Sequence, residues 1–284
     1  MDGRTESLVR RGHLTCHCLL IELDSELVLV DTGLSLRDAA EPGRLSAFFL
    51  SLLSPDFREE MTAIGQIRRM GFDPRDVRHI VLTHLDFDHA GGLDDFPHAT
   101  VHMLDAERDN AFAQKTWLDR QRFRPQQWST KQNWRVYAPT AGDDWFGFER
   151  VRPLDGLPPE IAMIPLVGHT HGHCGVAVNR GDRWLLQAGD AYFFHAEMDV
   201  DRPSCTPGLR FYQWMMQKNG AARVQNQRRL RELRRTRGGE VEIFCGHDVL
   251  EFERLSGRSA SVPANKMSSA TRASRDIGLQ HSHA

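Results

Sequence analysis

The sequence predicts an α/β fold, and two observations lead to that prediction. Short apolar runs typical of buried strands alternate with segments whose apolar residues have helical spacing. Side chains that can bind metal ions follow directly after several of the strand-like runs, where α/β proteins commonly place their active sites. Strands followed by a helix occur in each half of the chain, which is compatible with one domain built from two related halves.

In the first half of the chain, strands are predicted at 15–23 and 27–30, joined by a short polar turn. Residues 34–60 contain two prolines and little periodicity, so we expect loop with short helical pieces. A helix is predicted over 61–70, because apolar residues recur there at spacings of three and four. The apolar run at 78–83 predicts the next strand.

The middle of the chain is less regular. Residues 99–103 read as a short strand, and 105–118 are compatible with a helix. Residues 119–150 are polar, aromatic and irregular, and a connection of that length is usually functional or mobile.

The second half repeats the pattern of strands followed by helices. Strands are predicted at 162–166, 176–178 and 184–188, the last two as a hairpin around a polar turn. Residues 209–235 predict one or two helices, and 241–244 predict the last strand.

The end of the chain differs in composition from the rest. After Leu255 it is rich in serine, alanine and arginine and poor in apolar residues, so it lacks the material for a packed core. We therefore predict a single domain over residues 1–256 and a flexible tail over 257–284.

Composition excludes several classes of function. The chain has 284 residues and a formal net charge of −2, so no basic field is present to attract nucleic acid or anionic lipid. No apolar run reaches the roughly 18 residues of a membrane span, and residues 1–6 lack a signal peptide's apolar segment. We expect a cytoplasmic protein without nucleic-acid or membrane partners, and the choice between a monomer and a homodimer stays open.

The stretch 83–92 carries two histidines and two aspartates directly after the strand predicted at 78–83. If its backbone stays extended, His84, Asp86 and Asp88 point to the same side, because side chains alternate along a strand. His89 then points elsewhere and could serve a second ion. Imidazole and carboxylate groups gathered in this way indicate a metal site.

Further candidate ligands stand at the ends of other strand-like runs. A lone histidine is usually a surface or core residue, whereas clusters beside acidic residues favour metal binding. The candidates are His169 in Gly168-His169-Thr170-His171-Gly172-His173, Asp190 in Ala188-Gly189-Asp190, and His247 in Cys245-Gly246-His247-Asp248.

The order and spacing of these residues resemble the metallo-β-lactamase-fold hydrolases. That family carries His-x-His-x-Asp-His, a later Gly-His-x-x-Gly-His, a Gly-Asp after a strand and a final Gly-His. The turn at 31–33 (Asp-Thr-Gly) also resembles the family's early turn, and the match runs from about Leu14 to Leu250. The resemblance implies a four-layer αββα sandwich with a dinuclear metal site at one edge of its two sheets.

The same resemblance implies roles for individual residues. Carried over by position, one ion would be held by His84, Asp86 and His169, the other by Asp88, His89 and His247, and both would be bridged by Asp190. His173 matches a family position that is structural rather than a ligand.

Asp86 departs from the family pattern, because it stands where the family has its second histidine. Imidazole suits zinc, whereas carboxylate-rich sites tolerate manganese or iron better. We therefore expect two divalent ions, zinc first, with iron or manganese as alternatives. A site with one metal ion, in which Asp86 is a solvent-facing loop residue, stays open.

The implied chemistry is hydrolysis. Two divalent ions a few Å apart lower the pKa of a bridging water from 15.7 toward roughly 7, and the resulting hydroxide attacks an electrophilic carbonyl. Asp88 would orient this nucleophile or shuttle a proton. Tyr192 is a second catalytic candidate, as a hydrogen-bond donor to an oxyanion. The family's lactonases have their tyrosine where Phe193 stands here, so a packing role for Tyr192 is an equal alternative.

We therefore predict a metal-dependent hydrolase that cleaves a lactone or another carboxylic ester, a small-molecule substrate. The tryptophan-rich stretch 117–148 would supply aromatic walls for an acyl chain, and the chain length resembles the lactonase branch. A thioester hydrolase of the glyoxalase II type is one alternative. An iron-dependent oxidoreductase, either a persulfide dioxygenase or a diiron reductase, is another and is favoured by Asp86. A binding protein without catalysis is disfavoured by the complete set of ligands.

Overall fold

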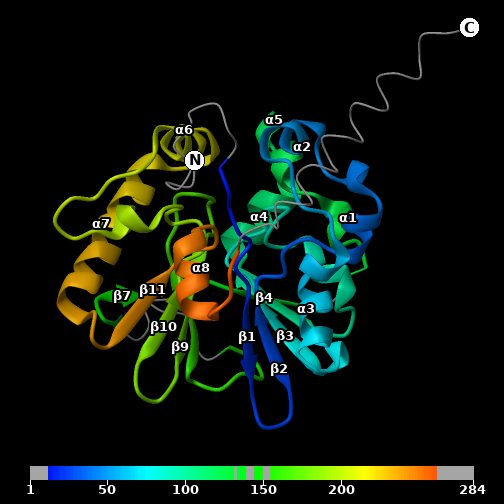
Figure 1. Cartoon of the computed structure of the whole chain (residues 1–284), viewed down its shortest axis with the longest axis horizontal. Helices are drawn as coiled ribbons and strands as arrows, with labels where there is room; N and C mark the ends of the chain where they lie inside the picture. The colour runs from blue at the N-terminus through cyan, green and yellow to red at the C-terminus, as the bar shows by residue number, and fades with distance from the viewer. Residues whose placement is uncertain (1–11, 131–132, 139–143, 150–153, 261–284) are drawn as a thin grey trace, which may run out of the picture.

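Two β-sheets form the centre of the molecule and helices cover their outer faces (Figure 1). The computed structural model describes residues 12–130, 133–138, 144–149 and 154–260. Within these residues the layers follow the order helix, sheet, sheet, helix. The predicted αββα sandwich is therefore confirmed.

The first sheet comes from the N-terminal half of the chain. Its strands are β1 (Leu19–Glu22), β2 (Leu27–Val30), β3 (Val77–Val81), β4 (Thr100–Leu104) and β5 (Trp134–Tyr137). They lie side by side in chain order. β1 and β2 form the predicted antiparallel hairpin, whereas β2 to β5 run parallel, so the carboxyl ends of these four strands share one edge.

The second sheet comes from the C-terminal half. Its strands are β8 (Ile161–Pro165), β9 (Cys174–Asn179), β10 (Trp184–Gln187) and β11 (Val241–Phe244), in the spatial order β11-β10-β9-β8. β9 and β10 form the second predicted hairpin, and β11 joins β10 in parallel. A separate short hairpin consists of β6 (Asp144–Trp145) and β7 (Phe148–Glu149).

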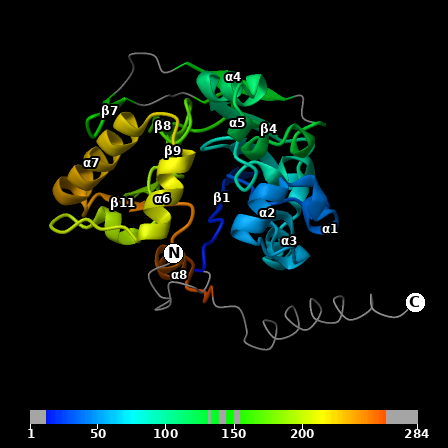
Figure 2. The same cartoon turned by 90° about the horizontal axis from the view of Figure 1, so that it is seen from above.

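The helices fall into two groups, one on each outer face. They are α1 (Leu36–Ala40), α2 (Ala47–Leu53), α3 (Ala63–Arg69), α4 (Asp105–Ala113), α5 (Trp117–Arg122), α6 (Pro207–Met216), α7 (Gly220–Arg237) and α8 (Val249–Ser256). Seen from above, α6 and α7 lie on one side of the strands and α1, α2 and α3 on the other (Figure 2). Each sheet is thus covered by helices from its own half of the chain.

The alternation of side chains along the strands explains the layers. In β2, Leu27 and Leu29 face the helices of the first half, together with Ile67 of α3. Val28 and Val30 face the other way and pack against side chains of β8 and β9 in the second sheet. Both faces of β2 are therefore buried, which is why its sequence is a continuous apolar run.

Several segments differ from the sequence prediction, among them β5, β6 and β7 within the stretch 119–150 that was expected to be irregular. Two further differences matter for the site. The helix predicted over 105–118 ends at Ala113, because Gln114 adopts a left-handed conformation, and α5 then begins after Thr116 with a capping box. Residues 15–17 are not part of β1. They run beside the loop after β11, where Thr15 N donates to His247 O at 3.2 Å and His17 N donates to Gly246 O at 2.8 Å.

The C-terminal helix α8 ends at Ser256, next to the start of the predicted tail. Residues 261–284 of that tail lie outside the described residues, so the proposed division into one domain and a tail stays a prediction. None of the helices in the described ranges is long and apolar enough to cross a membrane.

Candidate metal centre

The candidate ligands lie on loops that leave the ends of four strands, one in the first sheet and three in the second. His84 is on the loop after β3, and His169 is on the loop between β8 and β9. Asp190 follows β10 and His247 follows β11. The structure brings these loops together, so residues more than 150 positions apart in the sequence contribute to one site.

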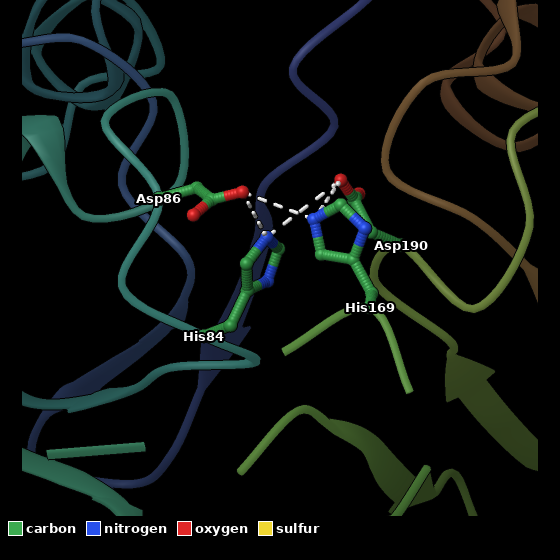
Figure 3. A group of neighbouring side chains, drawn as sticks. All are labelled: His84, Asp86, His169 and Asp190. Carbon is green, nitrogen blue, oxygen red and sulfur yellow. Dashed lines mark hydrogen bonds and ion pairs between the residues drawn. The ribbon is translucent and has the colours of Figure 1, made fainter. Parts of the chain in front are cut away.

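The first cluster consists of His84, Asp86, His169 and Asp190, whose side chains point toward one another (Figure 3). Asp86 Oδ2 lies 3.4 Å from His84 Nε2 and 3.0 Å from His169 Nε2. Asp190 Oδ2 lies 3.6 Å and 3.3 Å from the same two nitrogens. Zinc ligands at about 2.0–2.1 Å in a tetrahedron are about 3.3 Å apart, so these atoms fit a metal ion.

The second cluster consists of His89, His247 and Asp190, with Asp88 beside it. Asp190 Oδ1 lies 3.2 Å from His89 Nε2 and 3.1 Å from His247 Nε2. Asp88 Oδ2 lies 3.7 Å from His247 Nε2, and the Asp88 side chain is 15% exposed. Asp190 therefore directs one oxygen to each cluster, the arrangement that a bridging ligand needs.

Unpaired polar atoms support the assignment of a metal centre. His84 Nε2 and Asp190 Oδ1 are buried and have no hydrogen-bond partner among the described residues. His89 Nε2 and His247 Nε2 face each other at 3.2 Å. Buried polar atoms without partners are costly, and two imidazole nitrogens facing each other need a shared proton or cation. The donor atoms present therefore fit metal ions at both clusters.

Three of the histidines are held in place through their other ring nitrogen. The Nδ1 contacts are His84 with Thr83 Oγ1 at 2.9 Å, His89 with Asp31 Oδ2 at 2.9 Å, and His247 with the Thr15 carbonyl at 2.6 Å. Such contacts set the tautomer and aim Nε2 at the metal. The backbone contact from Thr15 explains why residues 15–17 lie beside the loop after β11.

Asp31 organises the loops from the first sheet. Its carboxylate accepts hydrogen bonds from Thr83 N and Thr83 Oγ1, both at 2.8 Å, and contacts His89 and Gln187. Its φ of 55° lies in the left-handed region, which is uncommon for aspartate and costs energy. The early Asp-Thr-Gly turn thus supports the ligand loop rather than supplying a ligand.

His173 has a structural role, as the sequence resemblance implies. Its Nδ1 contacts the Leu166 carbonyl at 2.9 Å, and its Nε2 accepts a hydrogen bond from Asp190 N at 2.8 Å. A Cβ on Gly189 would come within 2.6 Å of the same ring. Glycine at this position therefore lets the loop after β10 pack against His173 and present the carboxylate of Asp190.

The electrostatic environment favours ligand forms in the first cluster. Burial lowers the pKa of His169 to about 4, so its imidazole is neutral near pH 7, which is the form that binds a metal. Burial alone would raise the pKa of Asp190, but the surrounding histidines, led by His247 and His89, lower it well below the usual value. Asp190 is therefore ionised, as a bridging carboxylate must be.

Arg122, the last residue of α5, is fully buried beside the first cluster. Its Nε donates to Asp86 Oδ1 at 2.6 Å and its Nη2 donates to Asp86 Oδ2 at 2.5 Å. Burial would raise the pKa of Asp86, but the Arg122 guanidinium and then His84 hold it well below the usual value. Asp86 is 2% exposed, so it is a buried member of the site and not a solvent-facing loop residue.

Tyr192 does not reach the centre, contrary to the catalytic role considered from the sequence. Its side chain is fully buried in the core of the second sheet. Its hydroxyl donates to the Glu251 carboxylate, with Oε1 at 3.0 Å and Oε2 at 3.1 Å. The chain turns at 189–191, which directs Tyr192 behind the site and Phe193 toward it, where Phe193 stacks on His247 at 4.8 Å.

A different tyrosine faces the metal centre. Tyr212 of α6 is 7% exposed and packs edge-on against Phe193, with ring centroids 5.5 Å apart. Its hydroxyl makes no hydrogen bond within the described part of the chain. Burial and then the negative charges of Asp88 and Asp86 raise its pKa well above the usual value, so the phenol stays protonated and can donate a hydrogen bond.

A cavity of about 950 Å³ opens beside the second cluster. Asp88, His247 and Tyr212 line it on the side of the metal centre. Leucine and isoleucine side chains of β1, α2 and α3 line part of the rest, among them Leu20, Leu53 and Ile67. Its size and mostly apolar walls are typical of a small-molecule site.

Sequence reasoning missed Arg122 and Tyr212. Arg122 stands between Arg120 and Arg124 in a stretch that showed no clear periodicity, so nothing in the sequence distinguished it from its neighbours. Tyr212 lies on the helical spacing of Leu209 and Met216, which indicated packing. One sequence feature did point to another tyrosine: the position where the family's lactonases have their tyrosine is occupied by Phe193 here, one residue after Tyr192. A phenol at the site would therefore have to come from elsewhere in the chain.

Comparison with known proteins is consistent with this geometry. A family model described as the metallo-beta-lactamase superfamily matches residues 11–244. The chain is 40% identical over 235 residues to a probable metallo-hydrolase of Mycobacterium tuberculosis, covering 83% of this chain and 75% of the relative. It is 28% identical to an N-acyl homoserine lactonase of Bacillus thuringiensis, over only 37% of this chain and 43% of that protein.

Solved structures with the same fold include an N-acyl homoserine lactone hydrolase with N-hexanoyl-L-homoserine bound at its catalytic metal centre. That structure superposes with a TM-score of 0.64 at 20% identity and covers 89% of each chain. A variant of the B. thuringiensis enzyme AiiA with N-decanoyl-L-homoserine bound gives a TM-score of 0.63 at 20% identity, covering 87% and 86% of the two chains. These likenesses extend the agreement in fold over most of the chain. With the family match and the 40% identical relative, they lead to one conclusion: the chain belongs to the metallo-β-lactamase superfamily.

Proposed function

We propose that the chain is a metal-dependent hydrolase that cleaves a lactone or another carboxylic ester. The observation that carries the proposal is Asp190, which directs one carboxylate oxygen to each of two ligand clusters beside the 950 Å³ cavity. Two divalent ions held a few Å apart would supply an activated water nucleophile and polarise a carbonyl oxygen.

The proposed ligands follow from the two clusters. One ion would be held by His84, Asp86 and His169, the other by Asp88, His89 and His247, and Asp190 would be shared. Three imidazole groups with fixed Nε2 atoms favour zinc, with iron or manganese as alternatives.

Asp88 combines two properties that suit it to proton transfer. It lies beside His247, and it lines the cavity. A carboxylate there can orient the attacking water and carry a proton toward the leaving oxygen of the ester. The fully buried Asp86 cannot take this role, because Arg122 engages both of its oxygens.

Tyr212 is the proposed donor to the negative charge that develops on the substrate's carbonyl oxygen. Its hydroxyl is protonated, lines the cavity and is not engaged by another described residue. A donor held in place before the reaction stabilises an oxyanion without reorganisation. Tyr212 thus replaces Tyr192 in the mechanism inferred from the sequence.

The cavity supports an ester with an apolar acyl group. Its apolar walls extend away from the metal centre toward α3, which gives a hydrocarbon chain a place to bind. The lactonase structures with N-hexanoyl- and N-decanoyl-L-homoserine bound show that this fold accommodates such ligands. A thioester would use the same ligands and stays the nearest alternative.

The experiment is a hydrolysis assay of metal-loaded and metal-free protein on three substrate classes. The panel comprises acyl lactones, aryl esters and glutathione thioesters. We expect lactone or ester hydrolysis that disappears after chelation and returns with zinc. Hydrolysis of the thioester alone would favour the glyoxalase II type, and inactivity on all three classes would contradict the proposal and direct attention to iron-dependent oxidation.

A further inference from the structure

The pairing of Asp86 with Arg122 is a feature of this chain that the family pattern does not contain. Arg122 is fully buried, and two of its nitrogens meet both oxygens of the Asp86 carboxylate. Its third nitrogen, Nη1, donates to the Met216 carbonyl at 2.7 Å, at the end of α6. The guanidinium is therefore fixed on two sides by α6 and by the ligand loop.

Each member of this pair needs the other. A guanidinium cannot lose its proton, so a buried arginine requires a negative partner. Asp86 is the carboxylate that forms an ion pair with Arg122 among the described residues. Conversely, a carboxylate with 2% exposure is costly to bury without a counter-ion when no metal is bound. The bidentate geometry satisfies both groups.

The charges explain how an aspartate can stand at a histidine position. A neutral imidazole adds no charge to a metal site, whereas a carboxylate adds one negative charge. The guanidinium of Arg122 cancels that charge at a distance of 2.5 Å. The pair as a whole is neutral, like the imidazole that the family has at this position.

We propose that Asp86 and Arg122 act together as one neutral ligand unit that replaces the family's second histidine. Asp86 Oδ2 faces the metal position, and Arg122 is a positioning residue that fixes the carboxylate and balances its charge. A carboxylate oxygen has two lone pairs, so Oδ2 can accept from Nη2 and still bind an ion. The inference rests on the metal ligation proposed above, because it concerns how one of those ligands works.

One contact of Arg122 points to an alternative, in which the guanidinium competes with the metal ion instead of supporting its ligand. Arg122 Nη2 also lies 2.7 Å from His169 Nε2, which is a proposed ligand atom. An ion at the first cluster would take the lone pair of His169 Nε2, so this contact would be given up. Arg122 would keep its two bonds to Asp86 and its bond to Met216. If the His169 contact dominated instead, the guanidinium would compete with the ion.

The test is a double-substitution cycle with metal content as the readout. Wild type, Asp86→His, Arg122→Met and the double variant Asp86→His/Arg122→Met are loaded with zinc. Bound ions per chain are then counted by elemental analysis and native mass spectrometry, and affinity is measured by chelator competition. The number of ions does not depend on any substrate, so this result is separate from the hydrolysis assay.

We expect Asp86→His alone to lose the ion at the first cluster, although it restores the family residue, because it leaves a buried guanidinium unpaired beside the metal. Arg122→Met alone should weaken that ion about 10–100-fold, as loss of a group that orients a ligand does. The double variant should bind the first ion again. Retention of the second ion, held by His89 and His247, shows that each variant is folded.

Two results would overturn the inference. One is wild-type loading of the first cluster in Asp86→His, and the other is unchanged or tighter binding in Arg122→Met. If Asp86→His does not fold, the coupling between the two residues is measured through the free energy of unfolding instead. Adding Arg122→Met should then restore stability to the double variant. A double variant that is no more stable than Asp86→His would also refute the pairing. Absence of metal from the wild type would instead refute the proposed function itself.

Discussion

The two ligand clusters share Asp190 but differ in what surrounds them. The first cluster is closed, with His84 and His169 almost fully buried and Asp86 held by Arg122. The second cluster is open, since Asp88 and His247 line the cavity. If both clusters bind ions as proposed, the closed cluster would hold its ion more firmly and the open cluster would meet the substrate.

Substitution of the shared ligand should have the largest effect, because it removes the link between the clusters. Asp190→Ala is expected to lose both ions and to lower kcat/KM by at least about 10³-fold, since each ion supplies several kcal/mol of charge stabilisation. Metal content and hydrolysis are measured on the same sample. Asp182→Ala changes an exposed aspartate in a turn and should keep both properties. Loss of activity with both ions retained would argue against a bridging role.

Substitution in the open cluster should separate the two ions. His89→Ala is expected to lose one ion, to keep the other and to lower kcat/KM about 10³-fold, because several kcal/mol of stabilisation disappear. The fold should remain, as judged by circular dichroism. His98→Ala removes an exposed histidine and serves as the matched control. Wild-type activity in His89→Ala would exclude the open cluster from the mechanism.

Substitution of Tyr212 and of Tyr192 tests which of the two tyrosines contacts the substrate. Tyr212→Phe should lower kcat about 10²-fold, as removal of an oxyanion donor does, with metal content unchanged. Tyr192→Phe should leave kcat nearly unchanged but lower the free energy of unfolding by about 1–3 kcal/mol, because buried Glu251 loses a donor. The reverse pattern would assign the catalytic role to Tyr192.

The smallest effect concerns a histidine in the core, away from both clusters. Burial lowers the pKa of His102 to about 3, whereas an unfolded histidine titrates near 6.5. Between these values the unfolded chain binds a proton that the folded chain does not bind. His102 therefore lowers the free energy of unfolding by about 1.4 kcal/mol per pH unit as the pH falls below about 6.5.

That contribution is measured by denaturant unfolding of metal-free protein between pH 7 and pH 5. His102→Gln should reduce the slope of stability against pH, whereas His98→Gln, at an exposed position, should keep it. An unchanged slope in His102→Gln would show that the pH dependence arises elsewhere, in the histidines of the metal clusters.

The sequence was enough to predict the fold and the gathering of the candidate ligands, for a physical reason. Candidate ligands such as His84, Asp190 and His247 follow strands, and strand ends are where an α/β sandwich brings distant segments together. The types of these residues and their order along the chain are properties of the sequence itself, so the resemblance to the family could be recognised without a structure.

The groups around the ligands were harder to predict because they reach the site from helices. Arg122 and Tyr212 lie on α5 and α6, and which face of each helix points to the centre depends on packing between elements. Gln114 adopts a left-handed backbone conformation, which ends α4 early and sets the position of α5. No local sequence pattern predicted this break. Tyr192 was misplaced because the turn at 189–191 decides which of two adjacent aromatic residues faces inward.

The most direct test of the account is the number of metal ions bound per chain in purified, zinc-loaded wild-type protein. Two clusters that share Asp190 predict about two ions, with one released before the other as chelator is added. The ion released first should be the one that His89→Ala removes, since the open cluster faces solvent. A protein that binds no ion, or a single ion that survives both His84→Ala and His89→Ala, would contradict a shared dinuclear centre.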